Sequence, residues 1–233
     1  MSGSKEQQLW DACTSENLEL VKHFAKDPAI DVNWTDPKDN RTALYIACLH
    51  GHLFAVELLL KSPNIDVNKA QKEGATPFHI ACAQGHKEVV LSLLKDRRLN
   101  MNLPNHNQLS PLWCASQEGH LSVIECLLAS GREVDTKTKS IAGPAAWNNK
   151  TAVEIARAQG TRTKSADETE EEYARSKQNG SLIAVLLDSF EENPQQVRAR
   201  LREQLDFPGR IFFFFYFLFF FFFLFFFADC LIS

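Results

Sequence analysis

The sequence predicts an all-α solenoid of stacked helix-turn-helix units with short β-hairpin loops, followed by a C-terminal Phe-rich apolar segment. Three observations lead to this fold class. A stretch recurs three times with a spacing of 34 residues, each copy carries helix-start and helix-stop residues at the same places, and 13 of the 18 Phe residues lie between Phe212 and Phe227. Internal repeats with a period of about 20–50 residues are typical of solenoids and related arrays.

The three copies align without gaps. They are RTALYIACLHGHLFAVELLL, ATPFHIACAQGHKEVVLSLL and LSPLWCASQEGHLSVIECLL, which begin at positions 41, 75 and 109. Thr42, Thr76 and Ser110 are therefore 34 residues apart, and so are the Gly-His pairs that begin at positions 51, 85 and 119. One such stretch would be weak evidence, but three in a single register predict a repeat array.

Each copy has the pattern of two short helices. The hydroxyl residue at its second position suits an N-cap, and Pro77 and Pro111 follow at the first helical position, where a missing N–H costs nothing. The glycine of the Gly-His pair suits a positive φ after the first helix. An aliphatic stripe, such as Val56, Leu59 and Leu60, predicts the buried face of a second helix. Polar hairpins follow IDVN, IDVN and LNMN at the ends of the units.

This pattern resembles the ankyrin repeat, whose sequence signature is TPLHxAAxxGHxxIVxxLLxxGADVN. The resemblance is close over three copies, and it covers roughly residues 5–190 when the degenerate ends are included. It implies the ankyrin-repeat solenoid and a role in binding other proteins.

The resemblance also divides the chain. We expect an ankyrin-repeat domain over residues 1–190, with a cap at about 5–33, repeats at about 34–68, 69–102 and 103–135, and a degenerate repeat at 136–190 with an insertion at 161–180. Within the insertion, Ser165 and Glu168 are spaced as a capping box. Residues 191–209 predict an amphipathic helix or linker, with Asn193 as the cap and Pro194 as the first helical residue.

Composition narrows the function classes. The net charge of −4 gives no basic excess, so we expect no nucleic-acid binding. The N-terminus, MSGSKEQQLWDAC, lacks the apolar run of a secretory signal, and six Cys in such a chain indicate a reducing compartment. None of the motifs GxGxxG, GxxxxGK[ST], GxSxG and HExxH occurs, so we expect no enzyme, no cofactor and no small-molecule substrate.

The repeat register argues against a metal site. One column of the repeat, where small core residues are expected, holds Cys13, Cys48 and Cys82. Another column holds His52, His86 and His120. Because helices pack about 8–10 Å apart, two of these His residues cannot share a zinc ion, whose nitrogen ligands lie at about 2 Å. We therefore expect each His to bond to neighbouring backbone.

By the resemblance, a partner protein binds to a concave surface made by the hairpin tips and the exposed positions of the first helices. The tips contribute Lys38, Asp39, Arg41, Lys72, Glu73, Ala75, His106, Asn107 and Leu109. The first helices contribute Leu49, His50, Gln84, Gln117 and Glu118. Leu49 and Leu109 are apolar where polar residues would suffice, which makes them candidate contact anchors.

Aromatic residues mark the same face. The position of the TPLH histidine is occupied by Trp10, Tyr45, His79 and Trp113. In the family this side chain packs between repeats, and for the two Trp residues partial exposure toward the groove stays open as an alternative. Trp147 lies in the enlarged hairpin of the last repeat, and is either a binding anchor or a plug over that repeat.

The hairpin tips need a left-handed residue. Asn40 and Gly74 suit this conformation, whereas Gln108 does not, so we expect the third tip to be strained or differently shaped.

The C-terminal Phe-rich segment, residues 210–233, leaves two interpretations open. Ile211–Ala228 is a run of 18 apolar residues, which as a helix would span about 27 Å, close to the hydrocarbon core of a thin bilayer. Arg residues precede it and Asp229 follows, so this run would be a C-terminal single-pass anchor that keeps the repeats cytoplasmic. Its nearly homopolymeric Phe composition is instead what translation of a pyrimidine-rich, unspliced intron would produce.

The sequence thus predicts a non-catalytic scaffold or adaptor that binds a partner protein through its concave face, with or without a membrane anchor. The alternative is a regulatory ankyrin fragment of a larger protein, which includes the case of an enzyme whose catalytic part lies beyond residue 209.

Overall fold

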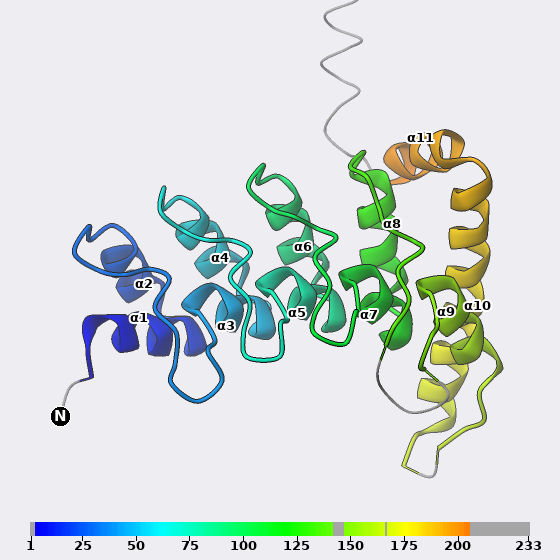
Figure 1. The fold of residues 1–233 in the computed structure, drawn as a ribbon, viewed down its shortest axis with the longest axis horizontal. Coiled ribbons are helices and arrows are strands. Elements are labelled where there is room, and N and C mark those ends of the chain that lie inside the picture. Colours follow the sequence, from blue (N-terminus) through cyan, green and yellow to red (C-terminus); the bar gives the residue numbers. More distant parts are fainter. Residues whose placement is uncertain (1–2, 142–146, 166, 206–233) are drawn as a thin grey trace, which may run out of the picture.

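The computed structural model describes residues 3–141, 147–165 and 167–205. Helix pairs stand side by side in one row (Figure 1), which confirms the all-α solenoid. The described helices are α1 (Lys5–Thr14), α2 (Leu18–Phe24), α3 (Ala43–His50), α4 (Leu53–Leu60), α5 (Pro77–Ala83), α6 (Lys87–Leu94), α7 (Pro111–Glu118), α8 (Leu121–Ala129), α9 (Ala152–Thr161), α10 (Glu170–Glu192) and α11 (Pro194–Gln204). Within the described part of the chain the hairpin loops form one isolated bridge, Thr35–Thr42, and no extended strand.

The first helix of each repeat begins where the caps predict. The side-chain oxygen of the N-cap accepts a hydrogen bond from the backbone N–H three residues later. The N-caps of α3, α5, α7 and α9 are Thr42, Thr76, Ser110 and Thr151. Pro77 and Pro111 are the first helical residues, as predicted.

Three of the second helices, α4, α6 and α8, are each tied to the preceding unit by the histidine at their N-cap. His86 Nε2 donates to the carbonyl oxygen of Leu49 (3.0 Å), and His120 Nε2 donates to that of Ala83 (2.9 Å). His52 makes the corresponding bond through Nδ1 to Cys13 (2.9 Å). The expected bond to backbone is thus confirmed, and its acceptor is in the neighbouring repeat.

The histidine rings also explain the glycine in each Gly-His pair. Gly51 and Gly85 have φ of +72° and +75°, a region that L side chains rarely adopt. A Cβ at either position would also lie 2.6 Å from the ring Nδ1 of the His in the next repeat. Both the backbone conformation and the close approach of the ring therefore require glycine here.

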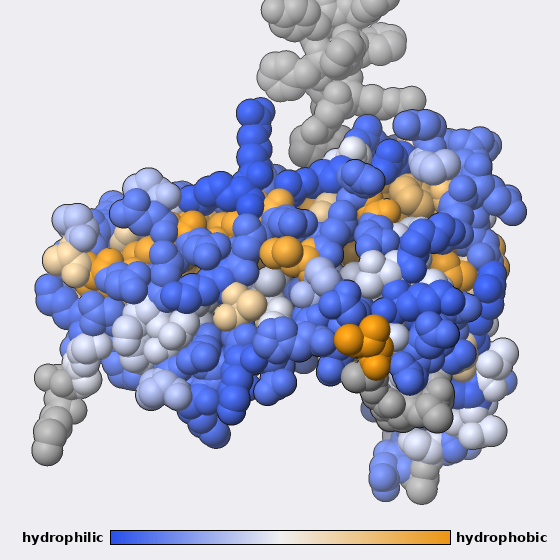
Figure 2. All heavy atoms as spheres, in the orientation of Figure 1, coloured by the Kyte–Doolittle hydropathy of each residue, from blue (hydrophilic) through white to orange (hydrophobic). Residues whose placement is uncertain are grey.

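Small and aliphatic residues fill the space between the helix pairs. Cys13, Cys48 and Cys82 are fully buried, as the repeat register predicts. Burial raises the pKa of the Cys13 thiol to about 12, so this side chain is neutral and packs as a small apolar group. Val56 and Leu59 are buried and Leu60 is half-buried, which confirms the apolar face of the second helix. Figure 2 shows hydrophobic residues in a band along an otherwise mostly hydrophilic face.

A second set of hydrogen bonds joins the loops that follow the second helices of consecutive units. Asn33 Nδ2 donates to the carbonyl of Asn64 (2.8 Å), and Asn33 Oδ1 accepts from the N–H of Asp66 (2.8 Å). Asn68 and Asn102 repeat this pair of bonds one and two units further along. The terminal Asn of each IDVN-type stretch therefore fixes the spacing of consecutive loops.

The degenerate last repeat differs from the sequence prediction. The capping box predicted at Ser165 and Glu168 is wrong: the box is formed by Thr169 and Glu172, and α10 runs unbroken from Glu170 to Glu192. The N-terminal part of α10 thus lies within the residues expected as an insertion. Thr169 is the N-cap because its hydroxyl accepts from the N–H of Glu172 and the Glu172 carboxylate accepts from the N–H of Thr169.

Helix α11 closes the C-terminal end of the array. Asn193 caps it and Pro194 begins it, as predicted, and Val197 and Leu201 are buried. The helix ends at Gln204, and the N–H of the C-cap residue Leu205 donates to the carbonyl of Leu201 (2.9 Å). Arg198 and Arg202 donate to the carbonyls of Arg132 (2.8 Å) and Ala129 (2.8 Å), which fixes α11 across the end of α8 (Figure 1).

No helix of residues 3–141, 147–165 and 167–205 combines the length and apolar character needed to cross a membrane. The predicted anchor, Ile211–Ala228, lies outside the described residues.

The third hairpin tip keeps the shape of the others, which leaves strain as the consequence of its unsuitable residue. Gln108 has a φ of +57°, equal to that of Asn40, and Gly74 has +83°. A Gln side chain in this region is disfavoured by about 1–2 kcal/mol relative to the right-handed conformation.

We therefore predict that Gln108→Gly raises the free energy of unfolding by about 0.5–1 kcal/mol, because the relief of strain exceeds the entropic cost of glycine. Urea unfolding followed by circular dichroism measures the change. Gln108→Ala is the matched control, since it retains a Cβ and should bring no such gain. Equal stability of the two variants would show that the tip is unstrained.

Candidate functional site

The hairpin tips form a row that is linked through the backbone. The N–H of Lys72 donates to the carbonyl of Asp39 (2.9 Å), and the N–H of His106 donates to that of Glu73 (3.1 Å). Ile141 continues the row by donating to the carbonyl of Asn107 (3.0 Å). Each tip is thus held by its neighbour, and the spacing between their side chains is fixed.

A polar side chain inside each loop shapes its tip. Asp36 accepts hydrogen bonds from the N–H groups of Lys38 (3.1 Å), Asp39 (3.0 Å) and Arg41 (2.6 Å). Burial of Asp36 opposes its ionisation, but these three backbone donors outweigh it, and the pKa of the carboxyl is lowered. In the second and third loops the corresponding acceptors are Gln71 and Asn105.

All the residues predicted to contact a partner lie at the surface or at its edge. Those that are exposed are Lys38, His50, Lys72, Glu73, Gln84, His106, Asn107 and Glu118. Those that are half-buried are Asp39, Arg41, Leu49, Ala75, Leu109, Gln117 and Trp147. Leu49 and Leu109, the candidate anchors, pack against the core with part of their surface. We call the exposed tip residues Lys38, Lys72, Glu73, His106 and Asn107 the tip row.

The aromatic column beneath the tips joins consecutive repeats. His79 Nε2 donates to the carbonyl of Leu109 (3.0 Å), and Trp113 Nε1 donates in the same way to that of Lys150 (3.0 Å). Both acceptors directly precede the N-cap of the next first helix. Trp113 is buried, with 1% of its surface exposed, so the alternative of exposure toward the groove is wrong for this residue. Trp10, in the N-terminal cap, is half-buried.

Trp147 folds onto the last repeat, as the packing interpretation of this residue expects. Its ring meets that of Trp113 edge to face, with 6.4 Å between the centroids. The remaining surface of Trp147 lines a pocket of about 490 Å³ at the C-terminal end of the array. The other residues that line this pocket are Gln117, Glu118, Ile155, Ala158, Gln159, Arg162, Glu168 and Ser176.

The structure therefore brings together three predicted residues, the adjacent Gln117 and Glu118 and the sequence-distant Trp147. Arg162 and Glu168, which form an ion pair, also line this pocket. These two residues were not predicted, because their contact depends on how the loop before α10 folds back. The polar loop residues Asp36, Gln71 and Asn105 were also missed, although their placement five or six residues before each N-cap was a usable signal.

No cluster of three or more metal-binding side chains occurs in the part of the chain that the structure describes. Five described cysteines are unpaired. Burial raises the pKa of Cys114 to about 12 and that of Cys126 to about 11, which disfavours the thiolate form that binds metals and attacks electrophiles.

His79 gives the array a specific pH dependence. The N–H of Thr76 donates to His79 Nδ1 (3.2 Å) while Nε2 donates to Leu109, so the ring is neutral. Burial lowers its pKa to about 4 from 6.5, against the opposing effect of the Leu109 carbonyl. The unfolded chain therefore takes up the proton first as the pH falls, and stability is lost between about pH 6.5 and pH 4.

We predict that this group removes about 2–3 kcal/mol from the free energy of unfolding between pH 7 and pH 4, and that His79→Gln abolishes this part of the slope. Urea unfolding at a series of pH values measures it. His106→Gln, at an exposed position, is the control and should keep the wild-type slope. Parallel curves for wild type and His79→Gln would contradict the assignment.

Comparison with known proteins supports the fold at the level of the family. The family model for ankyrin repeats, in three copies, matches residues 9–105 and 63–138. A comparison with curated proteins finds no match. The matched residues, 9–138, make up more than half of the 233-residue chain, and the protein belongs to the ankyrin-repeat family.

Proposed function

We propose that this protein is a non-catalytic scaffold or adaptor that binds another protein through the concave face formed by its hairpin tips and first helices. Ankyrin repeats imply protein–protein interaction, and the matched region is of a type that is typically non-catalytic. The identity of the face and the residues that contact the partner are the parts that we propose.

The observation that carries the proposal is the tip row itself. The backbone bonds from Lys72 to Asp39 and from His106 to Glu73 hold the tips in place before any partner arrives. A binding surface that is already ordered avoids the entropic cost of ordering loops on association. The tip-row side chains are exposed, and their charges of both signs suit a specific polar contact rather than a general electrostatic one.

The half-buried residues give the face its apolar component. Leu49 and Leu109 retain part of their surface beside the exposed His50 and Asn107. Trp147 contributes an aromatic surface at the C-terminal end. Aromatic residues in pockets that lose water on binding are common among the residues that dominate binding energies.

We predict that replacing Lys72, Glu73, His106 and Asn107 together by Ala abolishes capture of the partner and shifts the melting temperature by only a few degrees, because these side chains carry little of the packing. The full chain serves as bait in cell extracts, and the captured proteins are quantified by mass spectrometry.

The matched control replaces Glu88, Lys95 and Ser122, which are exposed on or beside the second helices and whose removal also leaves the net charge unchanged. The partner is the protein that the wild type and this control retain and the tip variant loses. Capture of the same proteins by all three would refute the proposed face, and a large loss of stability in the tip variant would show that these are packing residues.

Attachment to a membrane is a second proposal, favoured by the 18-residue apolar run Ile211–Ala228. In this form the protein is a tail-anchored adaptor that holds its partner at a membrane, with the repeats in the cytoplasm. Its competitor is a regulatory ankyrin fragment of a larger protein that continues differently beyond residue 209.

We predict that an antibody against residues 1–190 detects a band at 26.4 kDa that stays with the membranes after washing with alkaline carbonate, because an apolar span remains in the bilayer. A peripheral membrane protein serves as the control for complete extraction. A soluble band of different mass would contradict the anchor and favour the larger protein.

A further inference from the structure

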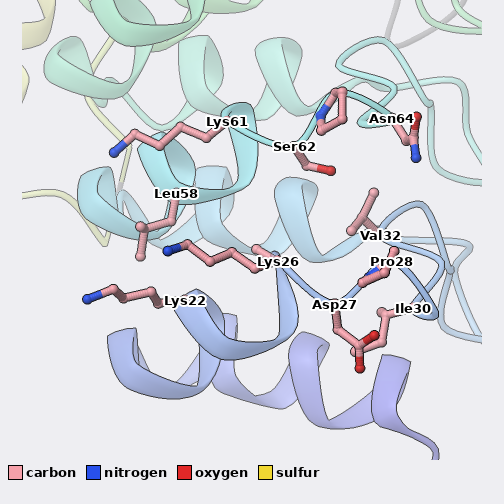
Figure 3. A pocket seen from close by; sticks show the side chains of 12 residues that line it. Lys22, Lys26, Asp27, Pro28, Ile30, Val32, Leu58, Lys61, Ser62 and Asn64 are labelled. Carbon is pink, nitrogen blue, oxygen red and sulfur yellow. The ribbon is translucent and has the colours of Figure 1, made fainter.

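A second pocket lies away from the tip row, between the N-terminal cap and the first repeat. It has a volume of about 310 Å³ and is formed by the C-terminal ends of α2 and α4 and the loops that follow them (Figure 3). Ile30, Val32 and Leu58 supply apolar surface to its wall. This combination of a concave shape and apolar lining is typical of binding sites.

The pocket exists because one side chain is short. We call the place where two consecutive units meet a junction. At the next junction, between the first and second repeats, Arg98 reaches back and donates to the carbonyls of Leu60 (2.9 Å) and Ser62 (3.1 Å). Asn64, which lines the pocket, stands 34 residues before Arg98, and its side chain cannot extend as far. At the junction after that, Arg132 donates to the carbonyls of Asp96 (3.3 Å) and Leu99 (2.7 Å). An arginine thus occupies the two later junctions but not the first.

The pocket is lined by positive charge. Lys22, Lys26 and Lys61 line one side of it, and in Figure 3 their side chains extend in the same direction, with Leu58 among them. Within the described residues, none of these three ammonium groups makes a hydrogen bond or an ion pair. The carboxylate in the lining, Asp27, is already paired with Lys5 at 3.0 Å.

The charge selects the occupant. A partner's arginine would fit the shape that Arg98 and Arg132 fill elsewhere, but Arg98 has a counter-charge in Asp96 (2.7 Å), whereas the residue 34 positions before Asp96 is Ser62. Three unpaired lysines would repel a guanidinium and attract carboxylates. In a chain with a net charge of −4, this local excess of positive charge is the opposite of the protein's average.

We propose that this pocket is a second docking site, separate from the tip row, for an acidic segment of a partner protein. The segment inserts one apolar side chain between Ile30, Val32 and Leu58 and sets its carboxylates against Lys22, Lys26 and Lys61. The apolar contact positions the segment in the pocket, and its carboxylates are attracted to the exposed lysines. Binding therefore weakens as added salt screens the lysine charges.

The test uses three fluorescein-labelled, end-capped hexapeptides, EELFEE, QQLFQQ and KKLFKK, in anisotropy titrations with the full chain. EELFEE is expected to bind saturably and at least tenfold more tightly than QQLFQQ at low salt, and KKLFKK is expected not to bind. The variant Lys22→Gln/Lys26→Gln/Lys61→Gln should weaken EELFEE binding at least tenfold. Asn64→Arg should weaken it as well, although it adds a positive charge, because the new side chain fills the pocket.

A second triple variant, Lys95→Gln/Lys139→Gln/Lys177→Gln, removes the same charge from exposed positions outside both the pocket and the tip row, and should leave EELFEE binding unchanged. If both triple variants weakened EELFEE binding equally, the effect would come from the net charge of the protein and not from the pocket, and the proposal would be overturned. Wild-type affinity in Asn64→Arg, or no saturable binding of EELFEE, would also overturn it. Binding of the wild type to vesicles of anionic lipid without binding to EELFEE would assign the lysines to a membrane surface instead.

The two binding sites are distinguished in the same experiment. Asn64→Arg should still capture the partner of the tip row from extracts, because Asn64 is not part of that surface. Loss of both activities in Asn64→Arg would show that the first junction has been distorted, and circular dichroism of the variant would detect such a change.

Discussion

The hydrogen bond from a histidine ring to the preceding repeat is the constraint on which the rest of the structure depends. The ring of His86 lies so close over Gly51 that no side chain fits there, and its Nε2 donates to the carbonyl of Leu49. The same arrangement recurs with His120 and Gly85. Because the glycine and the histidine that meet belong to different repeats, each repeat is positioned by its neighbour. Contacts between neighbouring repeats are therefore enough to hold the whole array in one continuous stack.

The regular stacking also sets the positions of the hairpin loops. Once the helix pairs are fixed, the loops lie in register, and the backbone bonds between tips follow without further adjustment. Asp36, Gln71 and Asn105 use their side chains to hold the loops, which leaves the exposed tip side chains free for contacts outside the molecule. In the first loop, for example, three backbone N–H groups donate to Asp36, while the side chain of Lys38 is exposed to solvent.

The regular part of this structure could be predicted from the sequence because it follows from local chemistry. A hydroxyl residue before a helix, Pro77 at its first position and a glycine after it each act within a few residues, and three copies in register reinforce each other. The array in turn predicted that Cys48 is buried. By contrast, the shape of the third tip could not be predicted from Gln108. The hydrogen bonds to neighbouring tips hold this residue at a positive φ, against the preference of Gln for a negative φ.

The last repeat could not be predicted for the same reason. It has no Gly-His pair, and its link to the preceding repeat is a different bond, from Asn179 Nδ2 to the carbonyl of Gly119 itself (2.9 Å). Only the contact itself identifies this residue, since Asn179 lies inside α10, which continues through the point where the other repeats turn. Likewise Trp147 lies 34 residues after Trp113, which is one repeat period, but the enlarged loop moves the N-cap to Thr151, so Trp147 meets Trp113 from the loop and not from the next first helix.

Departures from the repeat are therefore more informative about this particular protein than the repeat is. Residues that obey the pattern, such as His86, are explained by stacking alone and would serve any ankyrin array. Where Asn64 replaces an arginine, a pocket opens, and where Trp147 and the start of α10 enlarge the last unit, another one forms. A locally unsuitable residue in an otherwise consistent array is retained only if something compensates for it. In a binding protein, the natural compensation is contact with a partner, and both pockets lie where the periodic side chains cease to fill the space between neighbouring units.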